Sequence, residues 1–490
     1  MTQKQIHFYL NTEHLDNDVR SLFMAFFPGA QITRTEEEGA GEADLEAAVT
    51  MTQEEDGSDA LLTIRLKTQQ REMMRREAAE KPEDRKAVRT VCKCLLYRML
   101  SELTEKELPW GTLTGIRPTK IARTMLMEGA SQEEVIRYME DEMLCSSQKT
   151  KLSLEIAQRE IGLLKKLDYE DGYSLYIGIP FCPTTCAYCS FTSYPLSRFA
   201  GQVDTYLDAL EREIVFTAGL FQGKKLNTIY FGGGTPTTLT AEQMERLIAM
   251  VEKHFDLTWV QEWTIEAGRP DSITREKLEV IHAHPITRIS INPQTMKDET
   301  LKLIGRRHTV DQVREAFHLA RQVGFDNINM DIIVGLPDET PEDVENTLQE
   351  IQKLAPDSLT VHSLAIKRAA RLNTEKESFA SNKSVNNEAL MDLTRVYAAK
   401  MGHVPYYLYR QKNMTGNLEN VGYSRPGVEG IYNILIMEEV QTIVALGAGA
   451  ISKRVMGDRI ERCENAKDVK TYLERLDDML ERKRKLFADQ

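Results

Sequence analysis

Three cysteines at Cys-x3-Cys-x2-Cys spacing, Cys182, Cys186 and Cys189, carry the clearest chemistry in this sequence. They follow an apolar, β-branched run that begins at Tyr176, so we expect the thiols in a loop at the end of a strand. Three closely spaced thiolates can hold three corners of a cubane iron–sulfur cluster, which normally takes four cysteine ligands. Such a cluster keeps one iron open for a small molecule. The alternative is a zinc knuckle, which needs a fourth thiolate or imidazole and usually pairs its cysteines two residues apart.

Composition and charge argue against several classes of protein. No apolar stretch approaches the roughly 20 residues that span a bilayer, and the first residues lack the apolar core of a secretory signal. A net charge of −13 disfavours a nucleic-acid partner, although a local basic cluster can still bind an anionic small molecule. The four cysteines outside the motif are scattered, which favours a reducing cytoplasm over a disulfide framework. The sequence gives no indication of oligomeric state.

The pattern along the chain predicts four regions. Residues 1–90 are predicted to form a small N-terminal α/β domain, and residues 91–170 are predicted to form a helical linker region with amphipathic stretches. Residues 171–375 alternate strands with helices. Residues 376–490 predict an α+β extension that covers the substrate.

The third region sets the fold class. Its expected strands cover residues 175–178, 227–231, 263–267, 288–291, 328–334 and 359–364. Strand–helix alternation implies parallel strands joined by right-handed crossovers. Six such units are too few for an eight-stranded barrel. We therefore predict an α/β protein built on a partial (β/α)6 barrel.

Chemically distinctive residues fall just past the carboxyl ends of these strands, where parallel α/β architectures bind ligands. The Gly-Gly-Gly-Thr-Pro run at 232–236 allows a ligand close to the main chain and exposes backbone donors. Glu266, Gln294 and Asp331 lie near three further strand ends, and a Gly-Arg-Arg-His run occupies 305–308. We expect these groups to form one polar ligand site.

The cysteine motif, the Gly-Gly-Gly-Thr-Pro element and the strand-end residues, in this order, resemble the radical S-adenosyl-L-methionine (SAM) enzymes. Within them, the chain resembles the oxygen-independent coproporphyrinogen III oxidases (dehydrogenases) over roughly residues 172–475. Residues 406–423 and the extra N-terminal region are similar to the HemZ-type subgroup. The resemblance implies a [4Fe–4S] cluster and SAM as cofactors, a tetrapyrrole substrate, and a flavodoxin or ferredoxin as one-electron donor.

Carried over residue by residue, the resemblance implies that Cys182, Cys186 and Cys189 ligate the cluster. The residues implied to contact SAM are Tyr176, Tyr188, Gly233, Gly234, Thr235, Glu266, Gln294, Arg306, Asp331 and Ala365. Tyr176 and Glu266 are the predicted catalytic residues among them. In the family, the radical removes a hydrogen atom from a propionate arm, carbon dioxide leaves and a vinyl group forms.

A basic group after the last expected strand supports an anionic substrate. Lys367, Arg368 and Arg371 follow this strand, and Arg307 and Arg410 are predicted to join them. Guanidinium groups bind carboxylates in a strong and geometrically specific way. The alternative is a solvated basic turn.

Two positions depart from the best-known members of this family. Gly178 stands where they have a histidine, and Phe191 stands where they have a further cysteine. The absent cysteine is shared with the haem chaperones, which have the fold but not the decarboxylase role. Decarboxylation, haem binding and another radical reaction, such as methyl transfer or macrocycle opening, are therefore all open.

Overall fold

The computed structural model describes residues 4–39, 42–53, 60–79, 83–367, 369–375, 379, 385, 387–411, 418–457 and 459–488. The chain forms two compact units, one made of residues 1–158 and 409–419 and the other of residues 159–408 and 420–490. The sequence-based boundaries at 90, 170 and 375 stay predictions. No helix in the described ranges is both long and apolar enough to cross a bilayer.

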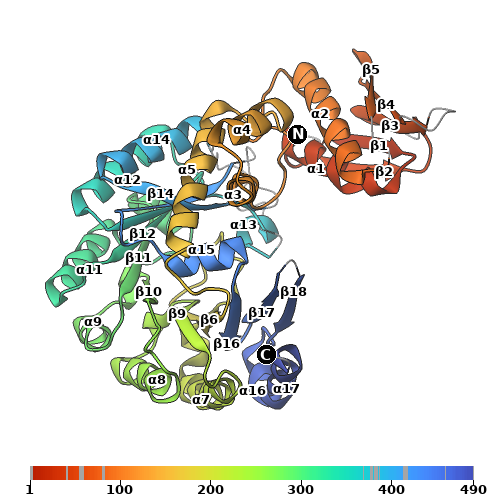
Figure 1. Cartoon of the computed structure of the whole chain (residues 1–490). Helices are drawn as coiled ribbons and strands as arrows, with labels where there is room; N and C mark the ends of the chain where they lie inside the picture. The colour runs from red at the N-terminus through yellow and green to blue at the C-terminus, as the bar shows by residue number, and fades with distance from the viewer. Residues whose placement is uncertain are drawn as a thin grey trace. The chain divides into compact units, whose positions relative to one another are not determined.

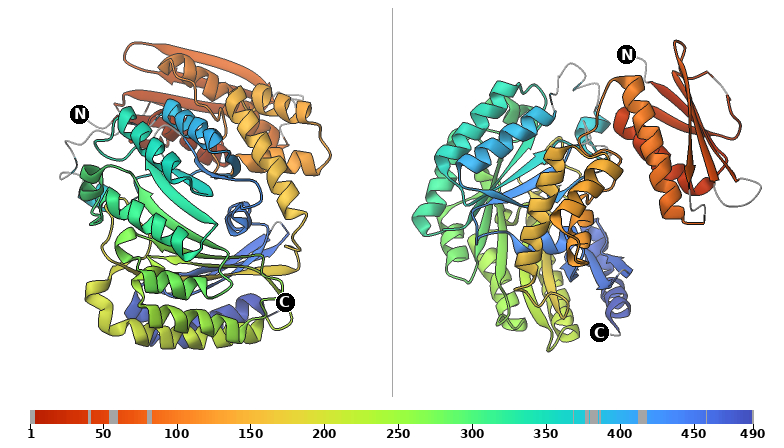
Figure 2. Two further views of the ribbon diagram at one scale, coloured as in Figure 1. Left: turned by 90° about the vertical axis from the view of Figure 1, so that its left-hand side faces the viewer. Right: turned by 45° about the horizontal axis from the view of Figure 1, so that its top comes forward.

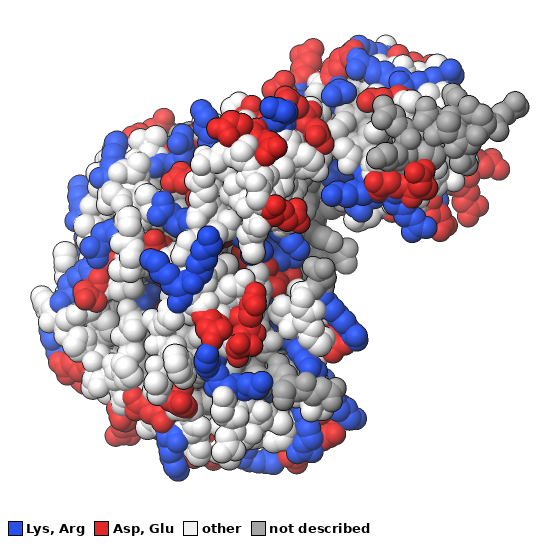
Figure 3. Space-filling model, in the orientation of Figure 1, with Lys and Arg blue, Asp and Glu red and all other residues white. Residues whose placement is uncertain are grey.

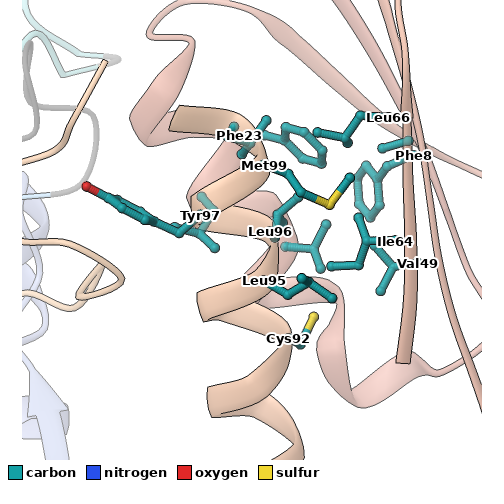
Figure 4. Close-up of a cluster of buried hydrophobic side chains, with 14 of the residues drawn as sticks. Phe8, Phe23, Val49, Ile64, Leu66, Cys92, Leu95, Leu96, Tyr97 and Met99 are labelled. Carbon is teal, nitrogen blue, oxygen red and sulfur yellow. The ribbon is translucent and has the colours of Figure 1, made fainter. Parts of the chain in front are cut away.

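The first unit begins with a five-stranded sheet. Its strand order is β2 (Gln31–Thr35), β1 (Gln5–Leu10), β3 (Leu45–Gln53), β4 (Ala60–Lys67) and β5 (Glu72–Ala79). Buried residues alternate along β1 and β4, so one face of the sheet is apolar. Helices α1 (Asp16–Phe26) and α2 (Arg85–Thr104) contribute the other side of this core. Figure 4 shows Cys92 on α2 among these apolar side chains, so this thiol is a core residue.

A helical part completes the first unit. It contains α3 (Thr119–Met127), α4 (Gln132–Arg137) and most of α5 (Ser147–Leu164). Residues 409–419 pack with this part through a buried cluster. The Glu419 carboxylate accepts hydrogen bonds from Trp110 Nε1 at 2.8 Å and from Lys149 Nζ at 2.7 Å.

The second unit contains an 11-stranded sheet. Its order is β14 (Val404–Tyr409), β15 (Asn420–Ser424), β13 (Ser358–Ser363), β12 (Ile328–Val334), β11 (Arg288–Gln294), β10 (Glu262–Gly268), β9 (Lys225–Gly233), β6 (Gly172–Ile179), β16 (Thr442–Leu446), β17 (Ile451–Met456) and β18 (Arg459–Glu464). Neighbours from β13 to β16 pair in parallel. This arrangement confirms the predicted α/β class with a partial barrel.

Helices cover the outer side of the parallel strands (Figures 1 and 2). They include α7 (Val203–Leu220), α8 (Ala241–His254), α9 (Arg275–His282), α11 (Val310–Val323) and α12 (Pro341–Leu354). Three of these helices begin with a capping box at Thr240, Thr309 and Thr340. In a capping box, side chains satisfy backbone donors that have no partner in the first turn. The loops that leave the strands therefore end at defined residues.

The C-terminal residues extend this sheet at both ends, because β15 pairs with β13 and β16 pairs with β6. Between these strands, α15 (Ile431–Glu438) lies on the inner side of the sheet (Figure 1). The remaining C-terminal helices are α14 (Glu388–Lys400), α16 (Val469–Glu474) and α17 (Leu476–Phe487). On the face drawn in Figure 3, basic and acidic side chains are interspersed.

Candidate active site

The three cysteines lie in the loop that leaves β6 at the carboxyl edge of the sheet. Here β7 (Phe181–Cys182) pairs with β8 (Tyr194–Pro195). The Ala187 N–H donates to the Ile304 carbonyl at 2.9 Å, and the Ala187 carbonyl accepts from the Leu372 N–H at 2.9 Å. Ile304 lies in the connection after β11, and Leu372 lies in the connection after β13. Connections from distant strands thus fix the position of the cysteine loop.

The environment of the thiols fits a cationic metal cluster. Burial, together with the neighbouring Cys186 and Cys189, raises the pKa of the Cys182 thiol to about 11. Burial also raises the pKa of Cys189, whereas the positive charge of Arg306 acts in the opposite sense. Crowded, buried thiolates need positive charge beside them, and iron–sulfur clusters provide it. In the part of the chain that the structure describes, no three His, Cys, Asp or Glu side chains are grouped to hold a single metal ion.

The glycine-rich element at the end of β9 packs directly on the connection that leads into the cysteine loop. The Gly234 N–H donates to the Ile179 carbonyl, and the Thr235 N–H donates to the Phe181 carbonyl, both at 2.7 Å. A Cβ atom at Gly234 would lie 2.5 Å from the Phe181 carbonyl oxygen, and Gly233 has φ = +105°. Glycine is therefore needed here for packing and backbone conformation. A contact of this element with SAM stays a prediction.

A stack of tyrosines lies on the inner side of the sheet next to Glu266. The Tyr230 and Tyr432 rings are 4.5 Å apart between centroids, and Tyr176 lies 6.2 Å from Tyr230. The Tyr230 hydroxyl donates to the Glu266 carboxylate at 2.5 Å. Burial raises the pKa of Glu266 to about 7, and the nearby charge of Asp331 acts in the same sense. Glu266 can therefore hold or release a proton near neutral pH.

Asp331 remains ionised in a hydrogen-bonded setting. Its carboxylate accepts from Asn329 Nδ2 at 2.7 Å and lies 3.8 Å from His362 Nε2. Burial disfavours the charged carboxylate, but His362 and the hydrogen bonds outweigh burial and lower the pKa of Asp331. The inner face thus carries two carboxyl groups whose pKa values are shifted in opposite directions, upward for Glu266 and downward for Asp331. Such pairs are typical of functional sites.

Gln294 and Arg306 offer buried polar atoms that no described protein group satisfies. Gln294, at the end of β11, has φ = +68°, and its Oε1 atom has no hydrogen-bond partner among the described residues. The Arg306 guanidinium donates to the Asn292 carbonyl and, at 3.1 Å, to the Tyr188 hydroxyl. Its Nε atom has no hydrogen-bond partner among the described residues. Buried polar atoms are rarely left unsatisfied, so both groups are suited to contact a ligand.

The predicted substrate-binding residues occupy different surroundings, and their role stays a prediction. Lys367 follows β13, and its Nζ atom lies 5.6 Å from the Phe191 ring centroid. Arg307 is exposed just beyond Gly305, whose Cβ position would lie 3.3 Å from the Thr185 carbonyl oxygen in the cysteine loop. Arg371, in the short helix α13 (Arg371–Thr374), forms a two-bond ion pair with Glu375. Arg368 lies outside the described residues.

Arg410 lies in a different setting from these cations. It falls in the first unit, where its side chain is buried and its guanidinium donates to the Leu113 and Leu418 carbonyls. Burial lowers the pKa of this guanidinium to about 10. Because Arg410 is committed to main-chain oxygens, we leave it out of the proposed substrate contacts. Nothing in the local sequence distinguishes such an internal arginine from an exposed one.

Sequence reasoning missed three residues of this region: Tyr230, Tyr432 and Glu339. Tyr230 precedes Gly232 by two positions on β9, so strand alternation could have placed it on the ligand side. Glu339, beyond β12, accepts the Thr295 hydroxyl, and burial raises its pKa to about 7. Tyr432 carries no local signal, because the distant helix α15 brings it here.

Comparisons with known proteins agree with this geometry. Residues 176–351 match the radical SAM superfamily. The chain is 45% identical to the oxygen-independent coproporphyrinogen-III oxidase-like protein HemZ of Bacillus subtilis, over 80% of this chain and 79% of that protein. It is 37% identical to the haem chaperone HemW of the same organism, over 39% of this chain and 50% of HemW. The solved structure of the coproporphyrinogen III oxidase HemN of Escherichia coli superposes with a TM-score of 0.51 and 26% identity, over 65% of this chain and 73% of that chain.

Proposed function

We propose that this chain, which belongs to the HemZ family of radical SAM proteins, binds a [4Fe–4S] cluster through Cys182, Cys186 and Cys189 and binds SAM beside it. When bound, the cluster and SAM supply a radical that abstracts hydrogen. The fixed cysteine loop next to unsatisfied atoms of Gln294 and Arg306 supports the proposal. A ligand that is both chelating and rich in hydrogen-bonding groups matches this arrangement.

The carboxyl groups of the inner face would orient SAM. Asp331 is ionised and can accept hydrogen bonds from cofactor hydroxyl or amino groups. We keep Tyr176 and Glu266 as the proposed catalytic pair, since Glu266 is poised to exchange a proton near neutral pH. The other proposed cofactor contacts are Tyr188, Gly233, Gly234, Thr235 and Ala365.

We propose coproporphyrinogen III as the substrate. Each reacting propionate would lose one hydrogen atom to the SAM-derived radical, one electron to a separate one-electron acceptor, and carbon dioxide, which leaves a vinyl group. The names of HemZ and HemN support this substrate, and Lys367 and Arg307 are cations that can bind the remaining carboxylates. A reduced flavodoxin or ferredoxin in the cytoplasm would deliver the electron that starts the reaction.

Product mass tests this proposal. The protein with its cluster assembled under anaerobic conditions is given reductant, SAM and coproporphyrinogen III. We expect 5′-deoxyadenosine together with a tetrapyrrole that has lost carbon dioxide from its propionates. 5′-Deoxyadenosine with an unchanged tetrapyrrole mass would rule out decarboxylation and indicate another radical reaction.

A haem chaperone is the second candidate. Phe191 stands where well-known decarboxylases carry cysteine, and the chain is 37% identical to the chaperone HemW over part of its length. A chaperone should bind haem with defined stoichiometry and should not cleave SAM in response to coproporphyrinogen. The same anaerobic assay, with haem titrated in parallel, separates the two functions.

A further inference from the structure

Phe191 is an exposed aromatic ring beside the cysteine loop. Its side chain is 70% exposed, the largest exposure among the large hydrophobic residues found on the described surface. Burial raises the pKa of Cys189, and a hydrogen bond from the Phe191 main-chain N–H opposes that shift. The main chain of Phe191 therefore contacts Cys189, one of the proposed cluster ligands. An exposed phenylalanine ring offers apolar surface that a ligand can cover.

Lys367 places a positive charge on this ring. Its Nζ atom lies 5.6 Å from the ring centroid, within the range of a cation–π contact. Phe191 comes from the connection after β6, and Lys367 comes from the connection after β13, which are the first and last of the predicted barrel strands. The Ala187–Leu372 hydrogen bond ties these two connections together. Phe191 and Lys367 therefore lie on two connections at the carboxyl edge that a main-chain hydrogen bond holds together.

We propose that Phe191 and Lys367 form a stacking platform for the macrocycle of an anionic tetrapyrrole, with Lys367 and the exposed Arg307 receiving its carboxylates. This inference rests on the proposed function and names the residues that would select its substrate. The pyrrole faces and carboxylate arms of a tetrapyrrole match an exposed aromatic ring bordered by cations. The exposed Ile366, next to Lys367 in the chain, adds apolar surface to the same connection.

A second exposed aromatic–lysine pair provides a matched control. Trp259 is 51% exposed, and Lys225 Nζ lies 5.1 Å from its ring. Lys225 begins β9 and Trp259 precedes β10, so this pair lies at the amino edge, away from the cysteine loop. This pair also combines an exposed ring with a lysine, although Lys225 is paired with Asp168, and it lies away from the proposed reaction site.

The experiment measures binding of coproporphyrin III, the planar oxidised macrocycle, to the protein with its cluster assembled and without SAM or reductant. Soret absorbance and fluorescence give the dissociation constant. We expect Phe191→Ala to weaken binding roughly tenfold and Phe191→Trp to keep it within about twofold. Lys367→Gln should weaken binding and reduce the salt dependence of the dissociation constant. Trp259→Ala should leave both the dissociation constant and its salt dependence unchanged.

The outcomes separate the platform from the proposed function. Iron content should stay the same in Phe191→Ala, because this change leaves the main-chain N–H toward Cys189 in place. Saturable wild-type binding that Phe191→Ala leaves unchanged, or that Trp259→Ala weakens equally, would overturn the platform and leave the proposed function standing. Absence of saturable coproporphyrin III binding by the wild-type protein would overturn the platform, whereas the proposed function, which concerns the reduced porphyrinogen, is decided by the product mass.

Discussion

Burial of the Glu266 carboxyl group on the inner face of β10 lowers the stability of the folded protein at neutral pH. Glu266 has a pKa of about 7, whereas its ordinary value is 4.5, because burial disfavours the charge. Between these two values the folded protein holds a proton that the unfolded chain has released. The Glu266 contribution to stability therefore falls as the pH rises from about 4.5 to about 7.

We predict that Glu266→Gln removes this dependence on pH in the ligand-free protein. At pH 5 the unfolding temperatures of Glu266→Gln and wild type should be close, and at pH 8 the variant should unfold a few degrees higher. Scanning calorimetry across this range measures the difference. The matched control is Glu315→Gln on the exposed face of α11, which should follow the wild type. If Glu266→Gln also follows it, the Glu266 carboxyl ionises normally.

The cysteines give a second prediction at the residue scale. Replacing Cys182, Cys186 or Cys189 by serine should reduce the iron from about four atoms per chain to well below one, because two remaining thiolates cannot retain a cubane. Cys463→Ser on β18 is the control and should keep its iron and sulfide. Chemical analysis and visible absorbance after anaerobic assembly decide the outcome. A Cys186→Ser protein with full iron content would refute the ligand assignment.

At the scale of elements, α15 brings a distant tyrosine to the candidate site. It presents Tyr432 to the inner side of the sheet, where the ring stacks on Tyr230. The Tyr432 hydroxyl is buried and has no hydrogen-bond partner among the described residues. A buried hydroxyl of this kind is unfavourable unless a ligand satisfies it.

We predict that Tyr432→Phe leaves the unfolding temperature of the ligand-free protein unchanged or higher, while SAM affinity falls roughly fivefold. Tyr472→Phe is the converse control, because the Tyr472 hydroxyl bonds Glu213 at 2.7 Å. It should lose about 1–2 kcal/mol of stability and keep its SAM affinity. Under anaerobic conditions, scanning calorimetry measures the stability and titration calorimetry measures the SAM affinity. Equal SAM affinity in Tyr432→Phe and wild type would place this hydroxyl outside the cofactor site.

At the scale of the whole molecule, the C-terminal residues brace the start of the barrel. Lys483 on α17 and Glu213 on α7 form a fully buried ion pair at 2.6 Å. Glu213 also accepts from the Gly447 N–H at 2.8 Å. Next to Gly447, the Ala448 N–H donates to Tyr206, whose hydroxyl donates to the Gly178 carbonyl. A charged network thus extends from the last helix to the strand end before the cysteine loop.

We predict that Lys483→Met costs about 3–5 kcal/mol, because it leaves the Glu213 carboxylate buried without its cation. The double variant Lys483→Met/Glu213→Gln should recover part of this loss. Arg246→Met breaks an exposed pair with Asp208 and should cost less than about 1 kcal/mol. Thermal unfolding of the four proteins measures these differences. A double variant no more stable than Lys483→Met would mean that packing, not charge, dominates this site.

The amino-acid sequence by itself determined the features that depend on neighbouring residues. The cysteine spacing, six of the seven parallel strands from β13 to β16, and helices such as α8 and α11 follow from local pattern, because periodicity and capping act over a few residues. The same locality explains why residues at strand ends could be assigned to one edge of the sheet.

Only the tertiary structure decided which distant side chains meet. Lys483 and Glu213 are 270 positions apart, and Tyr432 reaches Tyr230 only because α15 lies on the inner side of the sheet. Arg410, with the same local character as the cations near β13, is instead buried in another unit. Such contacts depend on how whole elements pack and register, and burial then sets the charge that each group carries.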